Sequence, residues 1–380
     1  MEAEQATFEG NAAEYFRIWI VNLLLSVVTL GIYSAWATVR NRRYFYGNTE
    51  FRGHRFDFHG KPLAILKGRL LAAALFLTYV FGSEFHPAIT VAALVTLLLG
   101  FPWMLVRAMH FRLANTSHRG LRFGFTGETR AAYRELGPLL AVITVVSGFY
   151  IWTTLQIDPE DQEAFLRQLP RLAIAGGLAI VGYLLLWPVL LFRIRRFTMN
   201  HIRFGNEGVE APIRVGVYWK AFALAILVGV VGGVGAMTLV FTLGSDLFMP
   251  KPGSVADPTQ SPYLFMAVTY GVLIPVYLLP WAIWHCITNN HVFNVSSLGT
   301  LRFDLRLDAL VFWWIQLTNA VAAVLTLGLA IPWAKVRLLR YRLSRLSVRG
   351  DTDEFLAGAR SDPGAAGDEI GEMFDLDFGF

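Results

Sequence analysis

Six long apolar stretches are the feature that most restricts how this chain can fold. The hydrocarbon core of a bilayer is about 30 Å thick, so a helix needs about 20 apolar residues to cross it. Six segments of the 380-residue sequence meet this requirement: 62–82, 88–106, 136–157, 172–192, 221–243 and 263–287. Only 16% of the residues are charged, whereas an ordinary soluble domain has about 25%. The sequence therefore predicts a multi-pass membrane protein made mainly of α-helices.

The distribution of basic residues predicts how these helices are oriented. Most of the 33 lysines and arginines fall in five segments: 40–69, 107–134, 193–220, 285–308 and 335–349. Three loops contain few basic residues and several acids: 83–87, 158–171 and 244–262. Because loops rich in Lys and Arg stay in the cytoplasm, we expect the five basic segments on the cytoplasmic side. We expect the three acidic loops to face outward.

Two further apolar stretches, 16–39 and 309–334, are interrupted by the same tripeptide, Thr29-Leu30-Gly31 in one and Thr326-Leu327-Gly328 in the other. If 309–334 crossed the membrane, the basic residues after it would lie outside, against the charge rule. We therefore expect both stretches to be re-entrant or in-plane hairpins that return to the cytoplasmic side, with both termini cytoplasmic. Gly31 and Gly328 would permit the reversal, because glycine adopts positive φ freely. An eight-span topology, with each stretch a helix kinked at glycine, is the alternative.

The sequence also repeats itself at two constant offsets. The residues from Trp36 to Gly60 recur 67 positions later, and the shared positions are Trp36, Arg40, Asn48, Thr49, Arg52, Gly53, Arg55, Phe56, Phe58 and Gly60. The second repeat lies 297 positions apart and links 22–44 to 319–341, including Asn22 with Asn319 and Arg40 with Arg337. In each unit a Trp suited to the headgroup level is followed one turn later by Arg.

Alternating residues follow the tryptophan and arginine of each unit. In the stretch 50–58, Phe56 and Phe58 face one way and the charged residues between them face the other, which is typical of a half-buried strand. The segment 7–10 is a further candidate. A lone strand leaves its backbone unpaired, so we expect four or five such strands to form a small cytoplasmic sheet.

The N-terminal series of residues carries a resemblance to a known family. In order, these residues are Phe8-Glu9-Gly10, Glu14-Tyr15-Phe16, Asn22, Thr29-Leu30-Gly31-Ile32-Tyr33, Trp36-Ala37, Arg40, Arg43-Tyr44 and Asn48-Thr49. The series resembles the YjgN family of bacterial inner-membrane proteins, a domain of unknown function, over about residues 7–350. The resemblance implies a location in the bacterial inner membrane and assigns no activity, cofactor or catalytic residue.

Polar residues inside the two interrupted stretches are the candidate site. Asn22 and Asn319 lie at membrane depth, where an unpaired polar side chain is costly and therefore marks a functional site by default. Gln316, one turn before Asn319, extends this putative polar intramembrane site. The other interpretation is structural, in which each asparagine ties its hairpin to a neighbouring helix. Thr29, Gly31, Thr326 and Gly328 are the expected turn residues.

Arginines beside these segments are candidate contacts for lipid headgroups or for an anionic solute: Arg40, Arg43, Arg107, Arg337 and Arg340. Anchoring to the cytoplasmic leaflet is the simpler explanation, because basic residues beside this leaflet need no other reason. The eight histidines form no His-Glu-x-x-His motif, and the chain has no nucleophile elbow or phosphate loop. We therefore expect no enzyme, no catalytic residue, no cofactor and no metal ion.

The complete prediction is a membrane all-α bundle with internal repeats, consisting of six full transmembrane helices, two re-entrant or interfacial hairpins and a small cytoplasmic sheet. Residues 1–350 would form this domain, 351–367 a flexible linker, and Asp368–Phe380 an acidic-hydrophobic tail.

Two functions of different classes fit these features. One is permease-like or channel-like transport of a small or lipidic solute, with the hairpins at the centre. The other is a non-catalytic adaptor that docks a partner through the sheet and the tail. The expected partners are the lipid bilayer and a protein that binds the tail, with no nucleic acid.

Overall fold

The computed structural model describes residues 3–155, 162–248 and 262–350, and these residues form two compact units. The first unit contains the chain up to Ile213, together with Val295–Phe303 and the described residues from Val348 onward. The second contains Arg214–Asn294 and Asp304–Ser347. The expected linker 351–367 and the tail Asp368–Phe380 lie outside the described residues.

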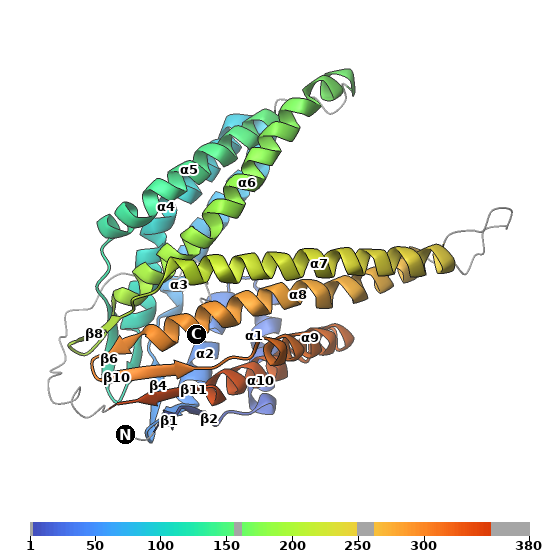
Figure 1. Cartoon of the computed structure of the whole chain (residues 1–380). Coiled ribbons are helices and arrows are strands. Elements are labelled where there is room, and N and C mark those ends of the chain that lie inside the picture. The colour runs from blue at the N-terminus through green and yellow to red at the C-terminus, as the bar shows by residue number, and fades with distance from the viewer. Residues whose placement is uncertain (1–2, 156–161, 249–261, 351–380) are drawn as a thin grey trace. The chain divides into compact units, whose positions relative to one another are not determined.

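Six helices belong to the first unit (Figure 1): α1 Ala12–Val28, α2 Ser34–Gly47, α3 Pro62–Phe85, α4 Pro87–Ala114, α5 Thr129–Leu155 and α6 Gln162–Asn200. A single residue, His86, separates α3 from α4. Its backbone is extended, and its Nδ1 accepts a hydrogen bond from the Ala88 amide at 3.1 Å. Proline begins each of these two helices, at a position where the backbone N–H has no helical partner anyway.

Four helices belong to the second unit: α7 Val215–Phe248, α8 Pro262–Val295, α9 Ala309–Leu325 and α10 Ile331–Ser344. The Asp308 side chain begins α9 by accepting a hydrogen bond from the Val311 amide at 2.8 Å. Phe312, on α9, has no exposed surface and lies in a core with Ala282 and Cys286 of α8. This core attaches the short helix α9 to the long helix α8.

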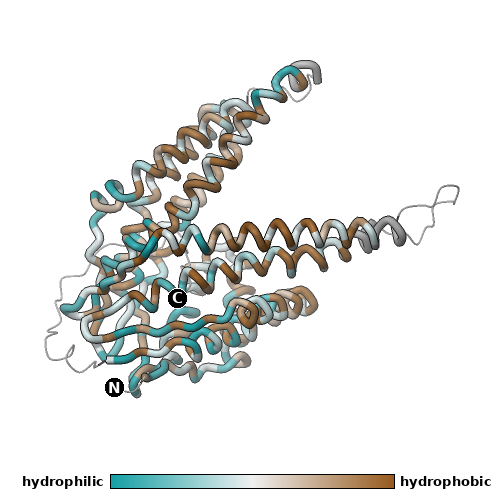
Figure 2. Tube along the Cα trace, in the orientation of Figure 1, coloured by the Kyte–Doolittle hydropathy of each residue, from teal (hydrophilic) through white to brown (hydrophobic). Residues whose placement is uncertain are grey.

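Six helices among the described residues, α3 to α8, are long and apolar enough to cross a membrane. Five of the predicted segments lie within these helices, and the sixth, 136–157, coincides with α5 up to Leu155, where the described residues of this part of the chain end. Many of their apolar side chains point away from the protein, and Val145 and Leu178, for example, are 71% and 62% exposed. Figure 2 shows the apolar residues along these helices in brown. Such surfaces are stable in lipid rather than in water.

The strands form one eleven-stranded sheet: β1 Glu4–Gln5, β2 Thr7–Phe8, β3 Thr49–Phe51, β4 His54–Phe58, β5 Thr116–His118, β6 Leu121–Phe125, β7 Ile202–Phe204, β8 Glu207–Glu210, β9 Ser297–Leu298, β10 Leu301–Leu305 and β11 Leu346–Arg349. Their order is β1-β11-β10-β9-β8-β7-β6-β5-β4-β3-β2. The sheet is thus larger than the four or five strands that we expected from the sequence.

The two end strands of this order, β1 and β2, are joined by Ala6 alone, so the sheet closes on itself into a ring, called the barrel below. A single hydrophobic core contains residues from strands all around the ring. It comprises Phe51, Phe204, Leu298, Leu301 and Val348, with Ala6 packed against it. Closure removes free strand edges, which would otherwise pair with other chains.

The expected single strand over 50–58 is wrong, because the chain reverses inside it. Arg52 and Gly53 have φ of 53° and 72°, and they form a two-residue turn between β3 and β4. Arg119 and Gly120 form the matching turn between β5 and β6, with φ of 53° and 79°. Positive φ at both central residues suits the right-handed twist of a tight hairpin. Each of these units therefore contributes two strands, and the sheet is correspondingly larger.

Candidate functional site

The segment with the Thr29-Leu30-Gly31 tripeptide folds as two helices, α1 and α2, joined by a tight turn. The Thr29 hydroxyl donates to the carbonyl of Leu25 at 2.7 Å and accepts from the amide of Tyr33 at 2.9 Å. Leu30 and Gly31 both have positive φ, 49° and 90°. The threonine thus closes one helix and opens the next, while the two residues after it reverse the chain.

The second tripeptide repeats this geometry between α9 and α10. The Thr326 hydroxyl donates to the carbonyl of Ala322 at 2.7 Å and accepts from the amide of Ala330 at 2.9 Å. Leu327 and Gly328 have φ of 50° and 91°. We call α1, its turn and α2 the first hairpin, and we call α9, its turn and α10 the second hairpin. The tripeptide therefore specifies one local turn conformation at both ends of the chain.

The tips of both hairpins are apolar and uncovered. The side chain of Leu30 is 94% exposed and that of Leu327 is 93% exposed, and the neighbouring Val28 and Leu325 are 78% and 79% exposed. A leucine with positive φ also carries a backbone cost of about 1 kcal/mol. The described residues leave these apolar side chains almost entirely uncovered, and a bilayer is an environment in which they would be stable.

A polar pair joins the two arms of the first hairpin. Asn22 of α1 is 3% exposed, and its amide group donates to Oδ1 of Asn41 on α2 at 3.1 Å. Within the described residues the Oδ1 atom of Asn22 has no hydrogen-bond partner. A buried acceptor without a partner costs about 1–3 kcal/mol. This oxygen is therefore a buried acceptor whose hydrogen bond the described residues do not supply.

The second hairpin has its own polar cluster. Asn319 is 7% exposed, and its amide group donates to the carbonyl of Ala334 at 3.3 Å. Nη1 of Arg337 donates to Oδ1 of Asn319 at 3.1 Å and to the hydroxyl of Thr318 at 2.7 Å. Gln316 is half-buried one turn earlier. Each asparagine thus joins the arms of its own hairpin, and a polar site shared by Asn22, Asn319 and Gln316 remains a prediction.

The candidate headgroup arginines differ in their surroundings. Arg40, Arg43 and Arg340 are exposed, and Arg107 and Arg337 are half-buried. Nε of Arg43 donates to the carbonyl of Phe58 at 3.2 Å, which ties α2 to β4. Arg43 and Arg337 therefore have structural partners in addition to any anion that they contact.

Arg69 is a polar residue that the candidate site predicted from the sequence did not include. It lies two turns into α3 and donates to the hydroxyls of Ser34 at 2.7 Å and Thr38 at 2.8 Å. These three side chains attach α2 to the first long apolar helix. The signal was in the sequence, because a charge this far inside an apolar segment normally has a polar partner.

Comparison with known proteins places this architecture in a family. A family model described as bacterial protein of unknown function (DUF898) matches residues 3–373. The chain belongs to this family. It is 26% identical to the inner membrane protein YjgN of Salmonella typhimurium, over 91% of this chain and 88% of that protein. It is 23% identical to the inner membrane protein YjgN of Escherichia coli K12, over 91% and 89% of the two chains.

The resemblance to the YjgN family, inferred from the N-terminal residues, is thereby confirmed. No solved structure matches the chain significantly. The relatives and the six apolar helices together identify a multi-pass inner-membrane protein.

Proposed function

We propose that this protein is a permease-like carrier of a small or lipidic solute, and that each of its two hairpins enters the cytoplasmic leaflet and contacts the solute there. The observation that carries the proposal is the pair of uncovered apolar tips, Leu30 and Leu327, 94% and 93% exposed. Apolar side chains this exposed would be unfavourable in water. They are suited to a hairpin that dips into lipid and comes back.

The depth of the hairpins supports entry into one leaflet. Six residues separate Asn22 from Val28 at the end of α1, and six separate Asn319 from Leu325 at the end of α9. At about 1.5 Å per residue the tips reach about 9 Å beyond the asparagines. One leaflet contributes about 15 Å of hydrocarbon. If the asparagines lie near the headgroups, the hairpins therefore end inside a single leaflet.

The charge pattern supports a cytoplasmic position for both hairpins, both termini and the barrel. The second arms of the hairpins, α2 and α10, contain Arg40, Arg43, Arg337 and Arg340, about two to four turns from the tips, where the phosphates of the cytoplasmic leaflet would lie. The outer loop at Glu84 is acidic by comparison.

A lipidic solute fits this arrangement better than an ion. In each hairpin the polar atoms of Asn22 or of the Asn319–Arg337 cluster lie nearer the headgroups than the apolar tip does. A lipid headgroup would therefore meet the polar atoms, and its acyl chain would meet the apolar tip. The apolar faces of α3 to α8 remain open to lipid. An ion would instead require an enclosed polar path.

The adaptor is the weaker proposal. Its tail, Asp368–Phe380, lies outside the described residues. The barrel is closed among the described strands, so it offers no free edge to which a partner could add a strand.

The proposal is tested by lipid movement in vesicles. The full chain is reconstituted into vesicles with a lipid that carries a fluorescent headgroup, and a membrane-impermeant quencher is added outside. The quencher alone bleaches only the half of the label in the outer leaflet. If the protein moves lipid between leaflets, more than half of the label should be bleached. The double variant Leu30→Asp with Leu327→Asp should abolish this effect, because a carboxylate in hydrocarbon costs about 3 kcal/mol. The matched control, Leu30→Met with Leu327→Met, should keep it.

A variant that ends at residue 367 separates the two proposals. It should move lipid like the full chain if the protein is a carrier. Bleaching that stops at half of the label for the full chain would refute lipid transport. Loss of a co-purifying partner in the shortened variant would then favour the adaptor.

A further inference from the structure

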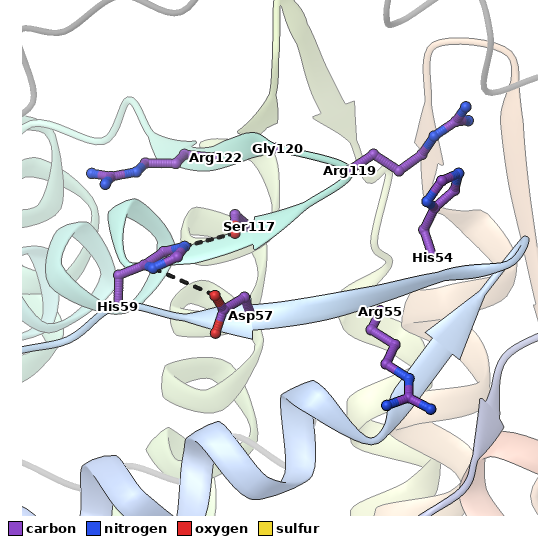
Figure 3. Close-up of a pocket in the computed structure, with 8 residues that line it drawn as sticks. All are labelled: His54, Arg55, Asp57, His59, Ser117, Arg119, Gly120 and Arg122. Atoms are coloured by element: carbon purple, nitrogen blue, oxygen red, sulfur yellow. Dashed lines mark hydrogen bonds and ion pairs between the residues drawn. The ribbon is translucent and has the colours of Figure 1, made fainter.

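A polar hollow of about 450 Å³ lies on the outer face of strands β4 and β5 (Figure 3). It is lined by eight residues: His54, Arg55, Asp57, His59, Ser117, Arg119, Gly120 and Arg122. Volumes of this size are typical of small-molecule sites. All eight residues belong to the first unit, and none of them is a hairpin residue that supports the proposed carrier function.

Strand register explains why these side chains meet. Asp57 of β4 lies opposite Ser117 of β5, and Ser117 lies opposite Arg122 of β6. The next pair along, Phe56 and His118, belongs to the opposite face, because side chains alternate along a strand. Three adjacent strands thus place a carboxylate, a hydroxyl and a guanidinium side by side on the outside of the barrel.

His59 is held at the edge of the hollow by two neighbours. Its Nε2 lies 2.8 Å from the Ser117 hydroxyl, and its Nδ1 lies 3.7 Å from Oδ2 of Asp57 (Figure 3). The order Asp, His, Ser is that of a nucleophilic triad. The exposures are wrong for one, however, because Ser117 is only 7% exposed whereas the Asp57 side chain is 62% exposed. Ser117 therefore orients the imidazole rather than attacking a substrate.

The charge of the hollow is predominantly positive. Three arginines and one carboxylate line the hollow, and that carboxylate already accepts a hydrogen bond from the Phe58 amide at 2.6 Å. Arg55 forms an ion pair with Glu9. Arg122 has no acidic partner within the part of the chain that the structure describes. Figure 3 shows Arg119 beside His54 at one end of the hollow and Arg122 beside His59 at the other.

We propose that this hollow binds a phosphate group, supplied by an anionic lipid headgroup or by a soluble organophosphate. Guanidinium groups bind phosphate oxygens with paired, charge-assisted hydrogen bonds. Arg119 lies in the β5–β6 turn and Arg122 lies on β6, and Figure 3 shows them at opposite ends of the hollow, so each end offers a phosphate one guanidinium group. His59, held by Ser117, forms part of the polar wall beside Arg122. The volume leaves room for the group that carries the phosphate.

The test measures binding of pyrophosphate to the full chain in neutral detergent, by calorimetry at fixed salt. Binding should be saturable, and Arg119→Gln with Arg122→Gln should weaken it about 100-fold, about tenfold for each arginine. The matched control is Arg302→Gln, an exposed arginine on β10 of the same barrel that lies outside the hollow. If the double variant does not fold, Arg122→Gln alone should still weaken binding about tenfold.

The same chain in nanodiscs distinguishes the two sources of phosphate. Hydrogen exchange of 54–59 and 116–122 is compared between discs of neutral lipid and discs that contain phosphatidic acid. Protection by the anionic lipid alone identifies a headgroup, and protection by pyrophosphate in neutral discs identifies a soluble ligand. The proposal is overturned if neither ligand protects these segments, or if Arg302→Gln weakens binding as much as the hollow variants do.

Discussion

The barrel should lose stability as the pH falls, because a histidine is enclosed in its core. His118 is 6% exposed, and its ring stacks on that of Phe56 with 4.4 Å between the centroids. Phe51 and Phe204 also contact this ring. Burial lowers the pKa of His118 to about 4, and the nearby charges of His54 and Arg119 act in the same direction. The folded protein therefore holds this imidazole neutral at neutral pH.

The sign of the effect follows from the two pKa values of His118. In the unfolded chain its pKa is the ordinary 6.5. Below that pH the unfolded state therefore binds a proton at His118, whereas the folded state does not until the pH approaches 4. The full stability is present above pH 6.5 and is lost progressively as the pH falls toward 4. Two and a half pKa units correspond to about 3 kcal/mol in total, of which about 2 kcal/mol is lost by pH 5.

Hydrogen exchange of the β4–β6 segments measures this loss, after correction for the intrinsic pH dependence of exchange. Between pH 7 and pH 5 the opening equilibrium of these strands should rise about thirtyfold. In His118→Phe, which keeps an aromatic ring and removes the titrating group, this rise should disappear. His86→Gln, an exposed histidine between α3 and α4, serves as the control and should behave like the parent chain. An unchanged pH dependence in His118→Phe would refute the reasoning.

Three substitutions test individual packing and turn arguments, each by the midpoint of thermal unfolding in detergent. Gly31→Ala should cost about 1–2 kcal/mol, because φ is +90° there although no atom lies within 4 Å of the added methyl. Gly60→Ala should cost about 1–3 kcal/mol, because its Cβ would lie 2.5 Å from the buried Phe58 ring. Arg69→Met should cost about 1–3 kcal/mol by leaving Ser34 and Thr38 without their donor, and equal midpoints would contradict this.

The six long helices were predictable because their signal is local. Length and hydropathy within one segment suffice, and each predicted segment coincides with one long helix, as in 263–287, which lies within α8. The ends were less predictable. The helices continue past the apolar residues into polar sequence, to Val295 in α8 and to Asn200 in α6. Hydropathy does not indicate the last residue of a helix that continues beyond the membrane.

The strands and the polar hollow depend on contacts that no single segment reveals. A turn at Arg52-Gly53 is hard to predict, since arginine rarely adopts positive φ. The alternation of 50–58 therefore suggested one strand instead of two. Asp57, His59 and Ser117 come together only through the register of β4 with β5. Neither charge nor spacing in the sequence indicates that register.

The central claim is that both hairpins enter the cytoplasmic leaflet and return, and labelling of their tips tests it most directly. Leu30→Cys and Leu327→Cys are introduced separately into a Cys286→Ala chain, which removes the one native thiol. The described residues leave both tips almost fully exposed, so the account assigns their shielding to lipid. Ala3→Cys and Ser344→Cys, both exposed, report the side on which the hairpins begin and end.

Glu84→Cys marks the opposite side of the membrane. With a charged, impermeant maleimide, the account predicts no labelling of the two tip cysteines from either side. It predicts labelling at positions 3 and 344 only after the cytoplasmic face is opened, and labelling at position 84 in intact cells. Labelling of either tip, or of position 3 or 344, from the outside of intact cells would contradict the account.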